Sequence, residues 1–148
     1  MTPEDFTAII YEVGQGSPRA AAVICGALLE DVLGRVLLAH APLKPKQKKR
    51  LDGNGSPMPM SKRISIARAC GLIDDGLEHD LSVITEIRND FAHTPRPMAF
   101  EHQSIADQCA TLRVLPDMKN VSPRMRYATV VGQLLARLLK IIGPDATL

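Results

Sequence analysis

Two long segments of this chain each open with a Ser-Pro pair and continue with apolar residues spaced three and four apart. Ser17-Pro18 begins one segment and Ser122-Pro123 begins the other. Serine is a favoured N-cap and proline is favoured in the first helical turn, and the apolar spacing places one face of each helix inward. The apolar positions are Cys25, Leu28, Leu29, Val32 and Val36 in the first segment, and Val130, Val131, Leu134, Leu135, Leu138, Ile141 and Ile142 in the second. The pattern predicts two long helices that bury these faces.

Shorter stretches carry similar start and stop signals, whereas strand signals are weak throughout. The predicted helices lie after Thr2-Pro3, from Pro18 to about His40, from Ser61 to Gly71, from Asp74 or Asp75 to just before Pro95, from about Ser104 to Leu112, and from Pro123 to Gly143. Residues 42–60 are basic and rich in Gly and Pro, and we expect a loop there because proline interrupts a helix interior. We therefore expect one all-α domain over residues 1–148, built as a single bundle of five to six helices.

Composition excludes several classes of protein. The chain has 148 residues, of which 45% are hydrophobic, so it can bury an ordinary core. It has no apolar run of the ~20 residues that a membrane span needs, and no signal-peptide pattern, so we expect a cytoplasmic protein without membrane contact. Cys25, Cys70 and Cys109 lie far apart, and no histidine pair has zinc-protease spacing. We expect buried thiols, no metal and no cofactor.

The segment from Arg88 to His93 carries the strongest functional signal. It contains a guanidinium, a carboxamide, a carboxylate and an imidazole within six residues, Arg-Asn-Asp-Phe-Ala-His. Arg88 falls on the same apolar stripe as Leu77, Leu81, Ile84 and Phe91. A charge that faces the core costs several kcal/mol unless it is paired or opens onto a cleft. Some other group must therefore compensate Arg88.

Glu30 is a candidate partner for Arg88. Arg19 and Glu30 are eleven residues apart, so they project from nearly the same face of their helix. Ala22 and Gly26 lie between them and are small enough to allow the helix that carries Arg88 to approach closely. We hypothesise that Arg19, Glu30, Arg88 and His93 converge in one polar cluster. The alternative is a purely architectural role, with Arg88 paired to any acid and His93 capping carbonyl groups.

This motif resembles two related families. Arg88 followed by Asn89 and by His93 is similar to the signature of the HEPN superfamily, in which four to six residues separate Arg from His. A closer resemblance is to the mannitol operon repressor family, a branch of similar helical proteins. It rests on Gly71-Leu72-Ile73-Asp74, His79-Asp80-Leu81, Ile87 to His93, the Asp52-Gly53-Asn54-Gly55 turn and the Pro18-Arg19-Ala20-Ala21-Ala22 helix start. The resemblance covers about residues 17–109 and adds Asp80 and Asp90 to the polar cluster.

The resemblance implies a HEPN-like helical bundle, often homodimeric, with a role in the transcription of a sugar-utilisation operon. It implies a non-enzymatic regulator without its own DNA-binding domain, which acts through a protein or a nucleic acid. Two alternatives remain open. One is a metal-independent RNase, with His93 as general acid–base, Arg88 holding the phosphoryl charge and Asn89 positioning the phosphate. The other is an antitoxin-like or inactive HEPN binding module. The acidic helix that carries the motif favours the two non-catalytic interpretations.

Direct DNA binding has two candidate elements. Ala67, Gly71 and Leu77 have helix-turn-helix spacing, but the second helix would bring Asp74 and Asp75 against the phosphates, so we do not expect it to read DNA. The basic run in residues 42–60 is the better candidate for binding nucleic acid or an acidic protein, and its alternative is a solvated loop. Its basic residues are Lys44, Lys46, Lys48, Lys49 and Arg50. The chain has three Phe, two Tyr and no Trp, which disfavours base stacking.

Overall fold

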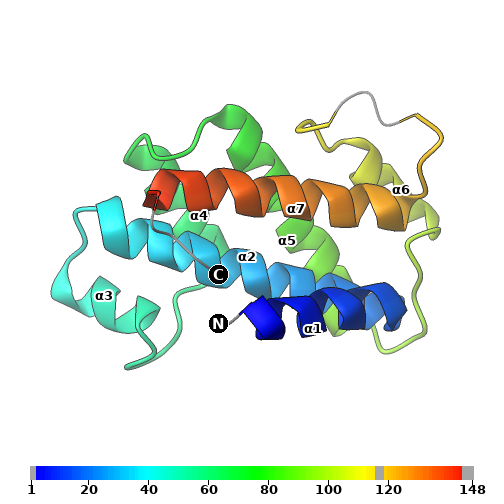
Figure 1. The fold of residues 1–148 in the computed structure, drawn as a ribbon, viewed down its shortest axis with the longest axis horizontal. Coiled ribbons are helices and arrows are strands. Elements are labelled where there is room, and N and C mark those ends of the chain that lie inside the picture. The colour runs from blue at the N-terminus through cyan, green and yellow to red at the C-terminus, as the bar shows by residue number, and fades with distance from the viewer. Residues whose placement is uncertain (1–2, 116–118, 145–148) are drawn as a thin grey trace.

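The structure, a computed structural model, describes residues 3–115 and 119–144. Within these residues the regular secondary structure consists of α-helices alone, which confirms the all-α class (Figure 1). The elements are α1 (Pro3–Gln15), α2 (Pro18–His40), α3 (Pro45–Leu51), α4 (Met60–Ala69), α5 (Asp75–His93), α6 (Gln103–Ala110) and α7 (Pro123–Ile142). The described part of the chain thus holds seven helices, against the five to six expected.

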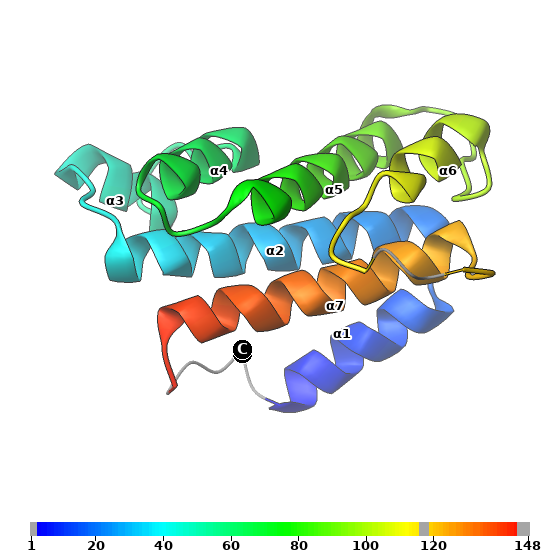
Figure 2. The same cartoon turned by 90° about the horizontal axis from the view of Figure 1, so that it is seen from above.

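Helix α2 is the central element of the bundle. The Ser17 hydroxyl accepts a hydrogen bond from the backbone N–H of Ala20 at 3.0 Å, and the helix ends before Pro42, both as predicted. Helix α2 contacts α1, α3, α4, α5 and α7. Seen from above, α4, α5 and α6 lie on one side of α2, while α7 and α1 lie on the other (Figure 2). Side chains from both layers therefore meet along α2.

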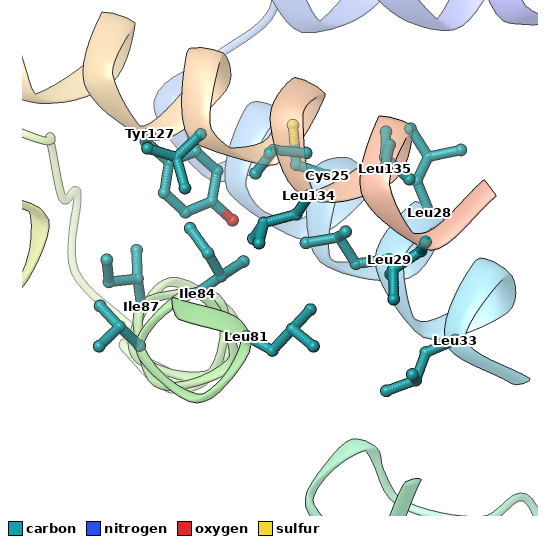
Figure 3. Close-up of a cluster of buried hydrophobic side chains, with 14 of the residues drawn as sticks. Cys25, Leu28, Leu29, Leu33, Leu81, Ile84, Ile87, Tyr127, Leu134 and Leu135 are labelled. Atoms are coloured by element: carbon teal, nitrogen blue, oxygen red, sulfur yellow. The ribbon is translucent and has the colours of Figure 1, made fainter. Parts of the chain in front are cut away.

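The core lies where α2, α5 and α7 meet (Figure 3). Its buried residues include most of the predicted stripes, such as Leu29, Val32, Leu81, Ile84, Leu134 and Leu138, and also Leu33 and Ile87, which the stripes did not include. Phe100 stacks between Phe91 and Tyr127, with ring centroids 4.9 and 5.1 Å apart. The buried Tyr127 hydroxyl donates a hydrogen bond to the carbonyl oxygen of Ala22 at 2.9 Å. This bond satisfies the one polar atom of the side chain and ties α7 to α2.

Helix α3 corrects the prediction of a loop over residues 42–60. Pro45 occupies the first helical turn, where its missing N–H needs no partner, so it starts a helix instead of interrupting one. The backbone N–H of Lys44 donates to Gln47 Oε1 at 2.9 Å and closes this first turn. None of the seven residues of α3 is buried, which explains why the apolar pattern gave no signal for it.

The α4–α5 connection follows the sequence signals with one shift. Helix α4 begins at Met60, so Ser61 lies in its first turn and is not the N-cap. Gly71 has φ +70°, the left-handed conformation expected after a helix. Asp74 then caps α5 by accepting a hydrogen bond from the backbone N–H of Leu77 at 2.9 Å. These local bonds set the position of the Arg88–His93 segment at the far end of α5.

Candidate functional site

Arg88 crosses from α5 over Gly26 of α2. A Cβ atom added at Gly26 would lie 2.6 Å from Arg88 Cγ and 3.1 Å from its Cβ, so the close approach predicted at this glycine is confirmed. The guanidinium is half-buried, and its Nη1 donates to Asn89 Oδ1 at 2.9 Å. Arg88 forms no ion pair with any residue that the structure describes. The carboxamide of Asn89, and not a carboxylate, is therefore its polar partner.

Glu30 pairs with Arg63, not with Arg88. Arg63 Nη2 lies 3.5 Å from Glu30 Oε1, and Nη1 donates to the main-chain oxygen of Glu30 at 2.7 Å. Arg63 is buried and its Nε donates to the Met58 carbonyl at 2.9 Å. Burial lowers the pKa of the Arg63 guanidinium, and Glu30 and Asp31 oppose that shift.

Sequence reasoning missed Arg63, although a signal for it existed. A Cβ at Gly34 would lie 2.6 Å from Arg63 Nη1, so Gly34 admits one arginine as Gly26 admits another. The two glycines are eight residues apart on α2, which places them about 80° apart around the helix. Two glycines in the interior of α2 indicate two places where another segment approaches this helix closely. They do not identify Arg63 as the residue that approaches at the second place.

Arg19 and His93 lie at the other end of the motif helix. Arg19 Nη2 donates to the carbonyl oxygens of Thr94 and Arg96 at 2.7 and 2.9 Å, and so it holds the chain that leaves α5. His93 is exposed and makes no hydrogen bond within the described residues. Arg19 and Glu30 share a face but are about 16 Å apart along the helix axis. The expected single cluster therefore divides into an Arg19 end and a Glu30–Arg88 end.

Asp80 and Asp90, which joined the cluster only through the family resemblance, connect α5 to α6 and the segment that follows it. The buried Asp80 carboxylate accepts hydrogen bonds from the backbone N–H of Arg113 at 2.9 and 3.1 Å and of Val114 at 2.8 Å. Asp90 is exposed and accepts from Gln108 Nε2 at 3.0 Å. Neither carboxylate compensates Arg88, because both project toward the α6 side of α5.

A polar groove runs along the interface of α4 and α5 and opens beside α2. A cavity of about 230 Å³ has Glu30, Ser61, Thr85, Arg88 and Asn89 as its polar lining. A second cavity of about 390 Å³ shares Ser61, Thr85 and Asn89 with the first, and adds Ser65, Glu78, Ser82 and Glu86. We call these two neighbouring cavities the polar groove. His93 does not line it.

The basic segment lies on and beside α3, at one end of the bundle (Figure 1). The four lysines at positions 44, 46, 48 and 49 are exposed. Arg50 is different, because its Nε and Nη2 donate to the carbonyl oxygens of Ser56 and Pro57 at 3.1 and 3.3 Å. It therefore holds the loop after α3, whereas the lysines are free to meet a partner.

Helix α5 is not arranged as a DNA-reading helix. It packs against α2, α4, α6 and α7 and buries Leu77, Leu81, Ile84 and Ile87. Its exposed first turn carries Asp74 and Asp75. Insertion into a DNA groove would require this central helix to leave the core while its acidic end approached phosphates. This geometry disfavours DNA reading by α5.

Three further features bear on the chemistry of the site. Among the described residues, no group of three or more His, Cys, Asp or Glu side chains is placed to hold a metal ion. Over the same residues, no helix has the length and apolar character to cross a membrane. Burial raises the pKa of the Cys25 and Cys109 thiols to about 11, whereas Cys70 is exposed, contrary to the expectation of three buried thiols.

Comparison with known proteins identifies a solved structure with the same fold. No family model matches the sequence, and no curated protein matches it. A solved structure does: the X-ray structure of the MtlR–HPr complex from Escherichia coli contains a chain with a TM-score of 0.60 and 19% identity. The match covers 91% of this chain and 96% of that one. The protein therefore has the fold of the mannitol operon repressor MtlR, which confirms at the level of the fold the resemblance seen in its sequence.

Proposed function

We propose that this protein is a non-enzymatic transcriptional regulator that acts through a protein partner. The observation that carries the proposal is the extent of the fold likeness, which covers 91% and 96% of the two chains and concerns a protein solved in complex with HPr. A shared surface for a protein partner is the simplest use of a fold retained over its whole length. The sequence resemblance adds a homodimer and a role in the control of a sugar-utilisation operon, and the composition of the chain adds a cytoplasmic location.

The geometry of the motif supports a non-enzymatic role. Arg88 and His93 are five residues apart on α5, so they project about 140° apart around the helix. Arg88 and Asn89 line the polar groove, whereas His93 is exposed outside it. An RNase needs its proton-transfer group and its phosphate-binding group on one substrate. Within one protomer these two side chains do not face a common pocket.

The lysines of α3 are the surface that we propose for the partner. Lys44, Lys46, Lys48 and Lys49 are exposed on a short helix that buries none of its own residues. Such a cationic element attracts an acidic protein surface and speeds association. Nucleic acid is the alternative occupant of the same lysines.

Titration of this protein with HPr from the same organism tests the proposal. We expect binding by calorimetry that weakens with salt and falls by about tenfold in the K46Q/K48Q/K49Q variant. The R137Q/K140Q variant is the matched control, since both residues are exposed on α7, a helix that does not contact α3. Absence of binding to HPr, together with capture of no other protein through the wild-type lysines, would contradict the proposed mode of action.

A ribonuclease is the second candidate, because His93 is exposed and makes no hydrogen bond within the described residues, so a second protomer could complete its site. Incubation with total RNA and tRNA in EDTA, beside H93A and R88A, decides the matter. Cleavage lost in both folded variants would make this a HEPN-type ribonuclease. RNA binding without cleavage would favour the inactive HEPN binding module. If the protein neither cleaves nor binds RNA, the protein-partner regulator remains.

A further inference from the structure

The polar groove contains a cation, Arg88, that forms no ion pair with any of the described residues. The aliphatic part of Arg88 rests on Gly26, which fixes where its guanidinium lies. Glu30 lines the same cavity, but Arg63 engages both its carboxylate and its main-chain oxygen. Of the five N–H donors of a guanidinium, one bonds Asn89. The remaining donors of Arg88 have no acceptor within the described part of the chain.

The end of the groove near Arg88 is rich in hydrogen-bond donors. Asn89 uses its carbonyl oxygen to accept from Arg88, so its NH₂ group remains a donor. Ser61 lines the same end and is exposed at the start of α4. A guanidinium, an amide NH₂ and a hydroxyl that line one cavity are suited to a carboxylate or a phosphate.

The second cavity of the groove is rich in acceptors. Thr85, which lines both cavities, donates its Oγ1 proton to the Leu81 carbonyl at 2.7 Å, and Ser65 Oγ, in the second cavity, donates to the Ser61 carbonyl at 3.0 Å. Both oxygens can therefore only accept from a ligand. Glu86 is exposed on the same wall and adds a carboxylate. This cavity is suited to a ligand that donates several hydrogen bonds, as a row of hydroxyl groups does.

We propose that the polar groove binds a small hydroxylated organic anion. Its acid group pairs with Arg88 and Asn89, and its hydroxyl groups donate to Thr85, Ser65 and Glu86. The second cavity, of about 390 Å³, has the size of a small-molecule site, and the first, of about 230 Å³, adjoins it through shared lining residues. Sugar phosphates and sugar acids share this chemistry. The site goes beyond the proposed partner binding, because the groove includes none of the α3 lysines, and it gives the protein a place for an effector.

The test is a set of four probes followed by calorimetry and by NMR of the backbone amides. Glucose 6-phosphate and gluconate carry both chemical features, inorganic phosphate carries only the anion, and glucose carries only the hydroxyl groups. We expect the first two to bind and to shift the amide signals of α4 and α5. We expect inorganic phosphate to bind more weakly than either and glucose not to bind.

Variants separate the site from a general charge effect. R88Q removes the cation, and S82L keeps Arg88 but fills the groove from its α5 wall, so each should weaken glucose 6-phosphate binding by about tenfold or more. R137Q removes an exposed arginine on α7 and should leave binding unchanged. Circular dichroism checks that each variant is folded. If R88Q does not fold, S82L alone tests the proposal. The proposal fails if no probe binds at millimolar concentration, or if the folded variants bind like the wild type.

Discussion

Gly26 of α2 lies directly beneath Arg88 of α5, and a Cβ atom at Gly26 would stand 2.6 Å from Arg88 Cγ. The contact joins α2 and α5, which form most of the core together with α7. It also sets the position of Arg88, the charged residue that shares the α5 stripe of Leu77, Leu81, Ile84 and Phe91. This close approach requires a glycine in the interior of α2, where glycine is less favourable than alanine by about 1 kcal/mol.

Gly26→Ala should destabilise the protein despite the better helix propensity of alanine. The added methyl group must displace Arg88 or separate α2 from α5, and overpacking of this kind costs about 1–3 kcal/mol. Gly132→Ala on α7 is the matched control, because nothing lies within 4 Å of a Cβ there, and it should stabilise by about 0.5–1 kcal/mol. Urea unfolding measures both, and equal shifts in the two variants would refute the close contact.

Asp80→Ala should be among the most destabilising polar substitutions in this chain. It leaves the backbone N–H groups of Arg113 and Val114 without their buried acceptor, at a cost of about 3 kcal/mol. Asp80→Asn retains one acceptor oxygen and should fall between alanine and wild type. Asp90→Ala, at an exposed position on the same helix, should cost less than about 1 kcal/mol. Thermal or urea unfolding that ranks Asp90 with Asp80 would contradict this account.

The three cysteines should differ sharply in reactivity. Cys70 is exposed, whereas Cys25 and Cys109 are buried with thiol pKa values of about 11. Because the thiolate is the nucleophile, a thiol reagent at mild alkaline pH should modify Cys70 alone in the folded protein. Mass spectrometry should locate the label, and urea should expose the other two. Prompt labelling of Cys25 or Cys109 without denaturant would show that the core opens readily.

Stability should fall as the pH rises through the window from about 9 to about 11. Burial raises the pKa of Cys25 and Cys109 from 9.0 to about 11 in the folded state, so between these values the unfolded chain binds fewer protons than the folded one. Burial also raises the pKa of Tyr127, which acts in the same direction at higher pH. The stabilisation is fully present below pH 9. Urea unfolding at several pH values measures the slope, and C25A/C109A should flatten it whatever its absolute stability.

The sequence by itself determined where most helices begin and end. Ser17, Ser122 and Asp74 accept hydrogen bonds from backbone N–H groups three residues ahead, and Gly71 takes the left-handed conformation after α4. These interactions join neighbours in the chain, so residue type and spacing are enough to predict them. The segment that was predicted as a loop but forms a helix is α3. Pro45 starts this helix, which buries none of its residues and therefore leaves no apolar pattern in the sequence.

Only the tertiary structure decided which charged groups meet. Angular position on α2 predicted correctly that α5 would approach closely at Gly26. It wrongly assigned Glu30 to Arg88, because Arg63 approaches from α4 over Gly34 and pairs with that carboxylate. Arg19 shares a helix face with Glu30 yet binds the chain after α5. Pairing between helices depends on their relative shift and crossing, which no local pattern records. For the same reason the polar groove between α4 and α5 appears only once the helices are packed.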